Sequence, residues 1–174
     1  MLVGALFLFF FLGPQFDSDA AVYWICIILL VDVFRLYAAV LFRINKKNNR
    51  VNYHIAEIHI LIGTILSGLC WGGLAVIMIP VIDMPGQMII LLMLIVISTA
   101  STTTLSYQLK YTLIFIPLVL SPVILTLPSQ AYFTGSQLWL LELALVALTI
   151  FLLKNAKIFH DSFFRIIMVF TWYY

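Results

Sequence analysis

Long apolar stretches separated by short polar ones run along the whole chain of 174 residues. Five of these stretches have about the 20 residues that a helix needs to cross the hydrocarbon core of a bilayer. A sixth, at residues 1–12, is shorter and is ended by Gly13 and Pro14, so we interpret it as a clipped first span. The expected spans are 1–12, 21–42, 55–81, 88–105, 111–127 and 137–153.

Continuous apolar runs favour helices over a β-barrel, whose strands would alternate apolar and polar residues. The sequence therefore predicts an all-α, polytopic membrane helix bundle of about six transmembrane helices with short loops. The composition agrees, since 64% of the residues are hydrophobic and 9% charged, against roughly 45–50% and 25% in soluble domains. Residues 1–153 are expected to form the bundle. Residues 154–174 are expected to form a cytoplasmic juxtamembrane helix with an unusually apolar tail, the product of a truncated or frameshifted gene.

The basic residues predict the orientation of the chain. With six spans, all nine lysines and arginines fall on one side of the bilayer, and Asp17, Asp19 and Asp83 fall on the other. The positive-inside rule then places both termini in the cytoplasm. If residues 1–12 do not cross, five helices remain, the basic loops stay cytoplasmic and only the N-terminus changes side.

Small residues recur at every fourth position within the span 55–81. Thr64, Gly68 and Gly72 form one helical stripe with few side-chain atoms, which lets a second helix approach closely. The hydroxyl-rich stretch 98–104 is expected to bond to carbonyls of its own helix and to pack on this stripe, in preference to lining a polar cavity. Pro117 and Pro122 are expected to kink the span that follows.

Asp32 and Arg35 are three residues apart in the second span and so share a helix face. An ionisable group within the bilayer costs at least about 2.5–3.5 kcal/mol, which makes the pair a candidate functional site. We favour the structural alternative, in which Arg35 extends to the cytoplasmic interface with Asp32 as its local partner. Glu142, one turn into the last span, is either a sensing carboxylate or a side chain that reaches the outer headgroups.

Trp71 is the fourth candidate intramembrane residue, because it lies deep in its span. Its indole N–H needs a hydrogen-bond acceptor, and a hydroxyl or carbonyl of the span 88–105 is the expected one. His54, Glu57 and His59 gather where the span 55–81 begins, but His59 points away from the other two, so they do not form a zinc pair. We find no catalytic, cofactor-binding or metal motif, and we expect neither an enzyme nor a cofactor.

Several short patterns follow one another along the chain: Trp24, Asp32-Val33-Phe34-Arg35, Ser67-Gly68-Leu69-Cys70-Trp71-Gly72, Phe115-Ile116-Pro117 and Asn155-Ala156-Lys157-Ile158-Phe159-His160. In this order and spacing, residues 2–165 resemble the N-terminal multi-helix membrane sensor region of bacterial GGDEF-type diguanylate cyclases and hybrid sensor histidine kinases. The resemblance implies a sensory input module of a signal-transduction protein, without its output domain. It also implies a homodimer in the bacterial inner membrane.

Two other functions remain open. A small transporter or channel would use Asp32, Arg35 and Glu142 to line one path near the bilayer midplane. The chain could also be a fragment without a function. The loops are too short to form a ligand-binding domain, so the lipid bilayer is the principal expected partner, and the net charge of +2 does not favour nucleic acid.

Overall fold

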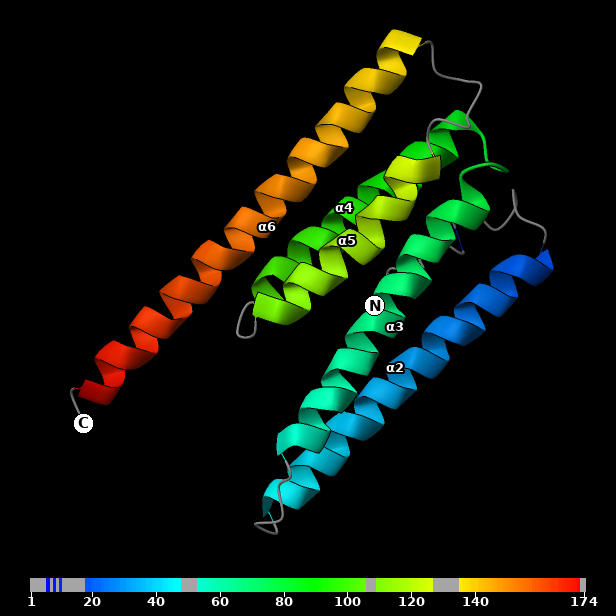
Figure 1. Ribbon diagram of the computed structural model, residues 1–174. Helices are drawn as coiled ribbons and strands as arrows, with labels where there is room; N and C mark the ends of the chain where they lie inside the picture. The colour runs from blue at the N-terminus through cyan, green and yellow to red at the C-terminus, as the bar shows by residue number, and fades with distance from the viewer. Residues whose placement is uncertain are drawn as a thin grey trace.

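The structure is a computed structural model that describes residues 6, 8, 10, 18–47, 53–105, 109–126 and 135–172. All of its elements in these ranges are helices, so the all-α prediction is confirmed. Figure 1 shows the helices as long rods that run side by side. They are α2 (Ser18–Lys47), α3 (Tyr53–Met78), α4 (Met84–Thr104), α5 (Leu109–Thr126) and α6 (Gly135–Trp172).

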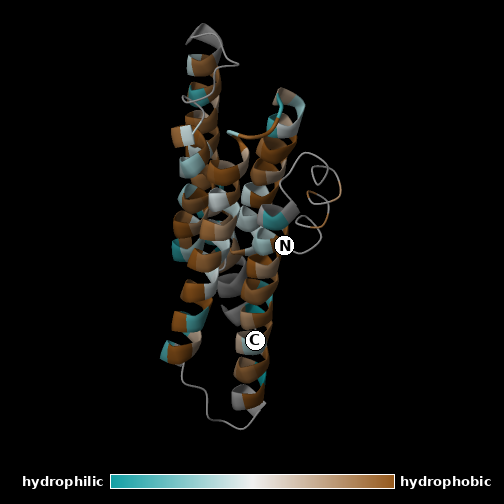
Figure 2. Cartoon of the chain, turned by 90° about the vertical axis from the view of Figure 1, so that its right-hand side faces the viewer, coloured by the Kyte–Doolittle hydropathy of each residue, from teal (hydrophilic) through white to brown (hydrophobic). Residues whose placement is uncertain are grey.

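Each of these five helices is long and apolar enough to cross a membrane. Hydrophobic residues follow most of their length, as Figure 2 shows in brown. The predicted sixth span, at residues 1–12, lies outside the described residues except for Leu6, Leu8 and Phe10, of which Leu8 is buried in the hydrophobic core. The five described helices correspond to the predicted spans from residue 21 onward, and six spans are not confirmed.

The turn between α3 and α4 lies earlier in the chain than predicted, because α3 ends at Met78 and not at 81, and α4 begins at Met84 and not at 88. Asp83 caps this helix, and its Oδ1 accepts a hydrogen bond from the backbone N–H of Gly86 at 3.0 Å. Gln87 is fully buried, and its Nε2 donates to the carbonyls of Ile79 (2.8 Å) and Ile82 (3.1 Å). These bonds satisfy carbonyls of the turn 79–83, which lies between the two helices.

Five of the six hydroxyl groups in the stretch 98–104 bond to carbonyls of their own helix, as predicted, and the exception is Ser98. Thr99 donates to the carbonyl of Ile95 at 2.8 Å, and Ser101 donates to that of Ser98 at 2.6 Å. Thr102, Thr103 and Thr104 form the same kind of bond. This hydrogen bonding allows a polar stretch to remain helical in an apolar environment.

The small-residue stripe of α3 packs against α5, and not against the hydroxyl-rich stretch of α4 as predicted. A Cβ atom added to Gly68 would lie 2.9 Å from the Cβ of Leu118. A Cβ atom added to Gly72 would overlap the carbonyl oxygen of Leu118 and lie 2.9 Å from the Cγ of Pro122. The close helix packing predicted from the stripe is therefore confirmed, but the predicted partner helix was wrong.

A proline explains why α5 is the partner. Pro122 has no backbone N–H, so it cannot donate to the carbonyl of Leu118, four residues earlier in the helix. This carbonyl packs against Gly72, whose Cα can offer a weak C–H···O contact. Pro122 thus frees a carbonyl, and Gly72 leaves the room for it.

The third residue of the stripe, Thr64, is also buried, and its hydroxyl donates to the carbonyl of Ile60 at 2.8 Å. Helices α3 and α5 form the centre of the described bundle. Among the described helices α2 contacts only α3, whereas α6 contacts only α4 and α5. The bundle therefore has α2 on one side, α3, α4 and α5 in the middle, and α6 on the other side, as Figure 1 shows.

We predict that Gly72→Ala lowers the free energy of unfolding by roughly 1–3 kcal/mol, because the new methyl group would overlap the Leu118 backbone. Gly68→Ala should cost less, since the atom it meets belongs to a side chain. Thermal or denaturant unfolding in detergent micelles measures both effects. Gly73→Ala is the matched control, because nothing lies within 4 Å of its added Cβ, and equal losses at Gly72 and Gly73 would contradict the prediction.

Candidate functional site

Arg35 is the side chain that joins α2 to α3 in the interior of the bundle. Its aliphatic stem packs on Gly63, where an added Cβ would lie 3.0 Å from the Arg35 Cγ. Its Nη1 donates a hydrogen bond to the Oγ of Ser67 at 3.4 Å. Ser67 is 1% exposed, so the guanidinium reaches into the helix interface.

The direction of the Arg35 side chain follows from the antiparallel pairing of α2 and α3. Phe34 stacks on the ring of His59 at 6.0 Å, which places this part of α2 level with His59. From there the side chain reaches Ser67, two turns or about 12 Å further along α3. It therefore runs toward the N-terminal end of α2, as helical side chains lean, and away from Arg43.

The favoured expectation for Arg35 is thus wrong, because its side chain does not extend to the basic end of α2. The reason is the pair of small residues on α3: Gly63 leaves room for the stem, and Ser67 offers an oxygen to the guanidinium. Their i, i+4 spacing is a sequence signal for such a groove that the sequence interpretation missed.

Asp32 lies on the same face of α2, nearly one turn from Arg35 toward the N-terminus, and is half-buried. Within the described residues Asp32 forms no hydrogen bond or ion pair. The structure brings the predicted pair together in the seam between α2 and α3, with Ser67 as an additional member.

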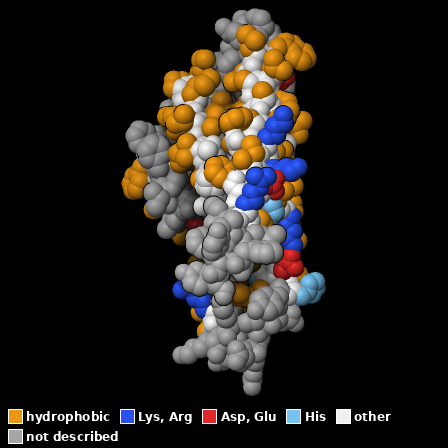
Figure 3. Space-filling view, turned by 90° about the vertical axis from the view of Figure 1, so that its left-hand side faces the viewer, with side chains coloured by type: hydrophobic (Ala, Val, Ile, Leu, Met, Phe, Trp, Pro, Cys, Tyr) orange, Lys and Arg blue, Asp and Glu red, His pale blue; other side chains and the backbone are white. Residues whose placement is uncertain are grey.

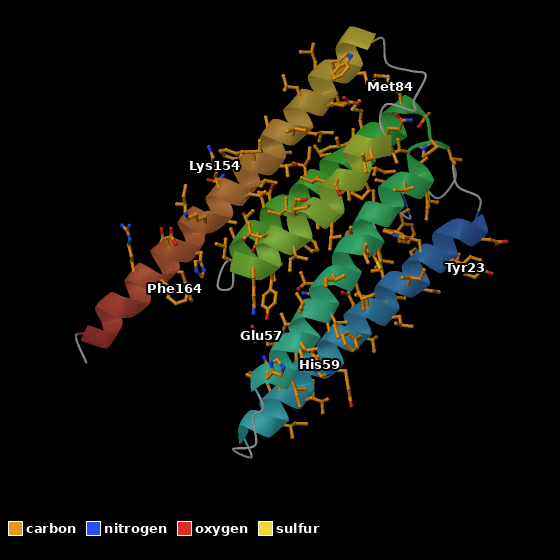
Figure 4. The ribbon with its side chains drawn as sticks, in the orientation of Figure 1. Tyr23, Glu57, His59, Met84, Lys154 and Phe164 are labelled. Carbon is orange, nitrogen blue, oxygen red and sulfur yellow. The ribbon has the colours of Figure 1, made fainter. Side chains whose placement is uncertain are left out.

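A polar layer at the starts of α3 and α5 indicates how deep this seam lies. Lys110 forms a salt bridge with Glu57, and the Tyr111 hydroxyl donates to the Glu57 carbonyl at 3.4 Å. Figure 4 shows Glu57 and His59 near this end of α3, far from Tyr23 and Met84 at the other end of the bundle. Ser67 follows Glu57 by ten residues, or about 15 Å of helix, which is about half of a hydrocarbon core.

Trp71 is fully buried, and its Nε1 has no hydrogen-bond partner within the described residues. The expected acceptor from α4 is therefore not found. Trp71 instead meets Trp24 of α2 edge to face, with ring centroids 5.4 Å apart at 82°. The Nε1 of Trp24 donates to the carbonyl of Cys70 at 3.1 Å, so this second tryptophan helps to fix α2 on α3.

Glu142 does not join the other candidates. It lies on α6, which does not contact α2 or α3, and it is half-buried. Near the start of α3, the Nδ1 of His59 lies 2.7 Å from the Ile55 carbonyl. No group of three metal-binding side chains occurs among the residues that the structure describes.

Gln87 and Thr112 were not identified from the sequence as buried polar residues, and Ser98 was expected to bond to a carbonyl of its own helix. Gln87 links α4 to the end of α3, and its Oε1 lacks a partner in the described part of the chain. The hydroxyls of Ser98 and Thr112 are also buried there without a partner. No motif marks these residues, because burial of a single polar group depends on the neighbouring helices.

The interpretation of the seam rests on its geometry. The sequence matches no family model, no curated protein and no solved structure. A guanidinium, a carboxylate and a hydroxyl within two apolar helices provide hydrogen-bond donors and acceptors in a medium that offers very few others. The seam between α2 and α3 is therefore the candidate functional site.

We predict that removing both charges, in Asp32→Asn with Arg35→Met, keeps or raises the thermal stability of the protein, whereas Asp32→Asn with Arg35→Ala lowers it. Methionine retains a stem that can pack on Gly63, while alanine loses this packing, and both double variants remove the two ions from an apolar environment. Unfolding midpoints in lipid nanodiscs test this difference. A large loss of stability in Asp32→Asn with Arg35→Met would show that the two charges are needed for folding.

Proposed function

We propose that this protein is the sensory input module of a bacterial signal-transduction protein, embedded in the inner membrane. The observation that carries the proposal is the length of α6. This helix is continuous for 38 residues, or about 57 Å, which is nearly twice the thickness of a hydrocarbon core. It extends beyond the ends of α4 and α5 in Figure 1 and is suited to pass a movement out of the bilayer.

One stripe of α6 supports pairing with a second copy of the chain. Leu145, Leu152 and Ala156 are buried, and α4 and α5 are the described neighbours of this helix. The same stripe continues in Phe159 and Phe163, which are 47% and 46% exposed. From 152 to 163 the spacing alternates between four and three residues, which is the spacing of a coiled-coil seam.

The charged residues of this part of α6 also favour a parallel homodimer. Lys154, Lys157, Asp161 and Arg165 lie away from the stripe, so identical charges would not meet across the seam. In Figure 3, lysine and arginine side chains lie mainly over the middle of this face of the molecule, and hydrophobic side chains cover most of its upper part. Under the positive-inside rule, the C-terminal end of α6, which carries these basic residues, is cytoplasmic.

The contacts between helices offer a route from the seam to α6. Arg35 links α2 to α3, and the Gly72 contact with Leu118 links α3 to α5. Helix α5 in turn packs against α6. A shift of α2 could thus reach α6 through two tight interfaces, by the small helix displacements common in signalling proteins.

A transporter is less favoured by the arrangement. Asp32 and Arg35 lie in the seam of α2 and α3, and Glu142 lies on α6, which contacts neither helix among those described. The three residues do not converge on one path near the midplane.

We predict that Phe163→Cys forms a disulfide between two copies of the chain in native membranes, whereas Lys157→Cys does not. The reason is that Phe163 lies on the apolar stripe and Lys157 lies on the opposite side of α6. Both variants are made with Cys26 and Cys70 replaced by serine, and oxidative crosslinking is read on a non-reducing gel. Adding Gly72→Leu should change the yield at Phe163→Cys, since it disturbs the route from α3 to α6.

Equal crosslinking at the two positions would contradict the pairing of α6. A yield at Phe163→Cys that Gly72→Leu leaves unchanged, in protein that remains folded, would contradict the coupling. Movement of ions or solutes by the purified protein in liposomes, without crosslinking at Phe163→Cys, would favour the transporter.

A further inference from the structure

We propose that Asp32, Arg35 and Ser67 form a binding site, open to the lipid, for an uncharged amphiphile with a hydroxyl head group. The role of this site as the input of the module rests on the proposed function. The binding itself does not, because it follows from the position and chemistry of the three side chains.

The site is accessible from the bilayer because α2 has a single helical neighbour. Among the described helices α2 contacts only α3, and Val33 and Leu36, next to Asp32 on the side away from α3, are 63% and 67% exposed. Asp32 and Arg35 themselves are half-buried at the edge of this seam. A molecule dissolved in the lipid can therefore reach the two side chains without passing through the interior of the bundle.

The hydrogen-bonding groups of the site are complementary to a hydroxyl. Asp32 is an acceptor without a hydrogen-bond or ion-pair partner in the described part of the chain, and an unsatisfied carboxylate in hydrocarbon is costly. Arg35 is a donor whose Nη1 is directed to Ser67, deep in the seam. A hydroxyl group can serve either partner, because it can donate to a carboxylate and accept from an N–H donor.

The charge of the site favours an uncharged head group. Asp32 and Arg35 supply one negative and one positive charge, so an amine or a carboxylate would leave a net charge within the membrane-spanning part of α2, where an ionised group costs at least about 2.5–3.5 kcal/mol. The phosphates of bilayer lipids lie at the interface, whereas Ser67 lies about 15 Å from the Glu57 layer. The ligand must therefore carry its polar group on an apolar body that enters the core.

Photolabelling tests this proposal on the full chain in lipid nanodiscs. The probe is dodecanol that carries a diazirine next to its hydroxyl, compared with dodecanoate and dodecyltrimethylammonium that carry the same photoreactive group. We expect saturable labelling of peptides from α2 and α3 by the alcohol probe, and competition by unmodified dodecanol. Asp32→Ala should weaken the labelling about tenfold, as for the loss of one charge-assisted hydrogen bond.

Glu142→Ala is the matched control, because it removes an intramembrane carboxylate from a helix that does not contact the site, and it should label like the unaltered chain. Any of three results overturns the proposal. The labelling does not saturate, it is equal for the three probes, or Asp32→Ala leaves it unchanged. If Asp32→Ala does not fold, the proposal is tested by Ser67→Ala, which should also weaken the labelling, and by competition with dodecanol on the unaltered chain. If the labelling succeeds but Phe163→Cys does not crosslink, the proposed function is overturned, whereas the binding site remains supported.

Discussion

The contact between Gly72 and the carbonyl of Leu118 determines how the bundle is assembled. In water-soluble proteins the hydrophobic effect brings helices together, but lipid is as apolar as the helices, so close packing must do more of this work. Pro122 frees the Leu118 carbonyl from its own helix, and Gly72 leaves room for that carbonyl to approach the backbone of α3. The close approach thus involves a residue from each helix.

The other helices are arranged around this interface. On one side, Arg35 and Trp24 attach α2 to the face of α3 that contains Gly63, Ser67 and Cys70. On the other side, α4 and α6 pack on α5. A polar seam and a long helix thus lie on opposite sides of one tight contact, and this arrangement supports the proposal of an input at α2 and an output at α6.

The sequence predicted the helices well, because the thickness of a bilayer sets the length of an apolar run. It placed the start of α4 too late, since the cap at Asp83 and the buried Gln87 leave no mark in the hydropathy. The sequence identified the stripe that contains Gly68 and Gly72, but such a stripe does not show which helix packs against it. The predicted direction of the Arg35 side chain was wrong for a similar reason, because the space at Gly63 and the hydroxyl of Ser67 belong to another helix.

A double-mutant cycle on Gly72 and Pro122 tests the central contact most directly. The free energy of unfolding is measured in micelles for Gly72→Ala, Pro122→Ala and the double variant. An alanine at 122 returns a backbone N–H to the Leu118 carbonyl and removes the ring that approaches Gly72, so the cost of Gly72→Ala should fall by about 1 kcal/mol or more in that background. Additive costs within about 0.3–0.5 kcal/mol would show that the two residues act independently and would contradict the contact.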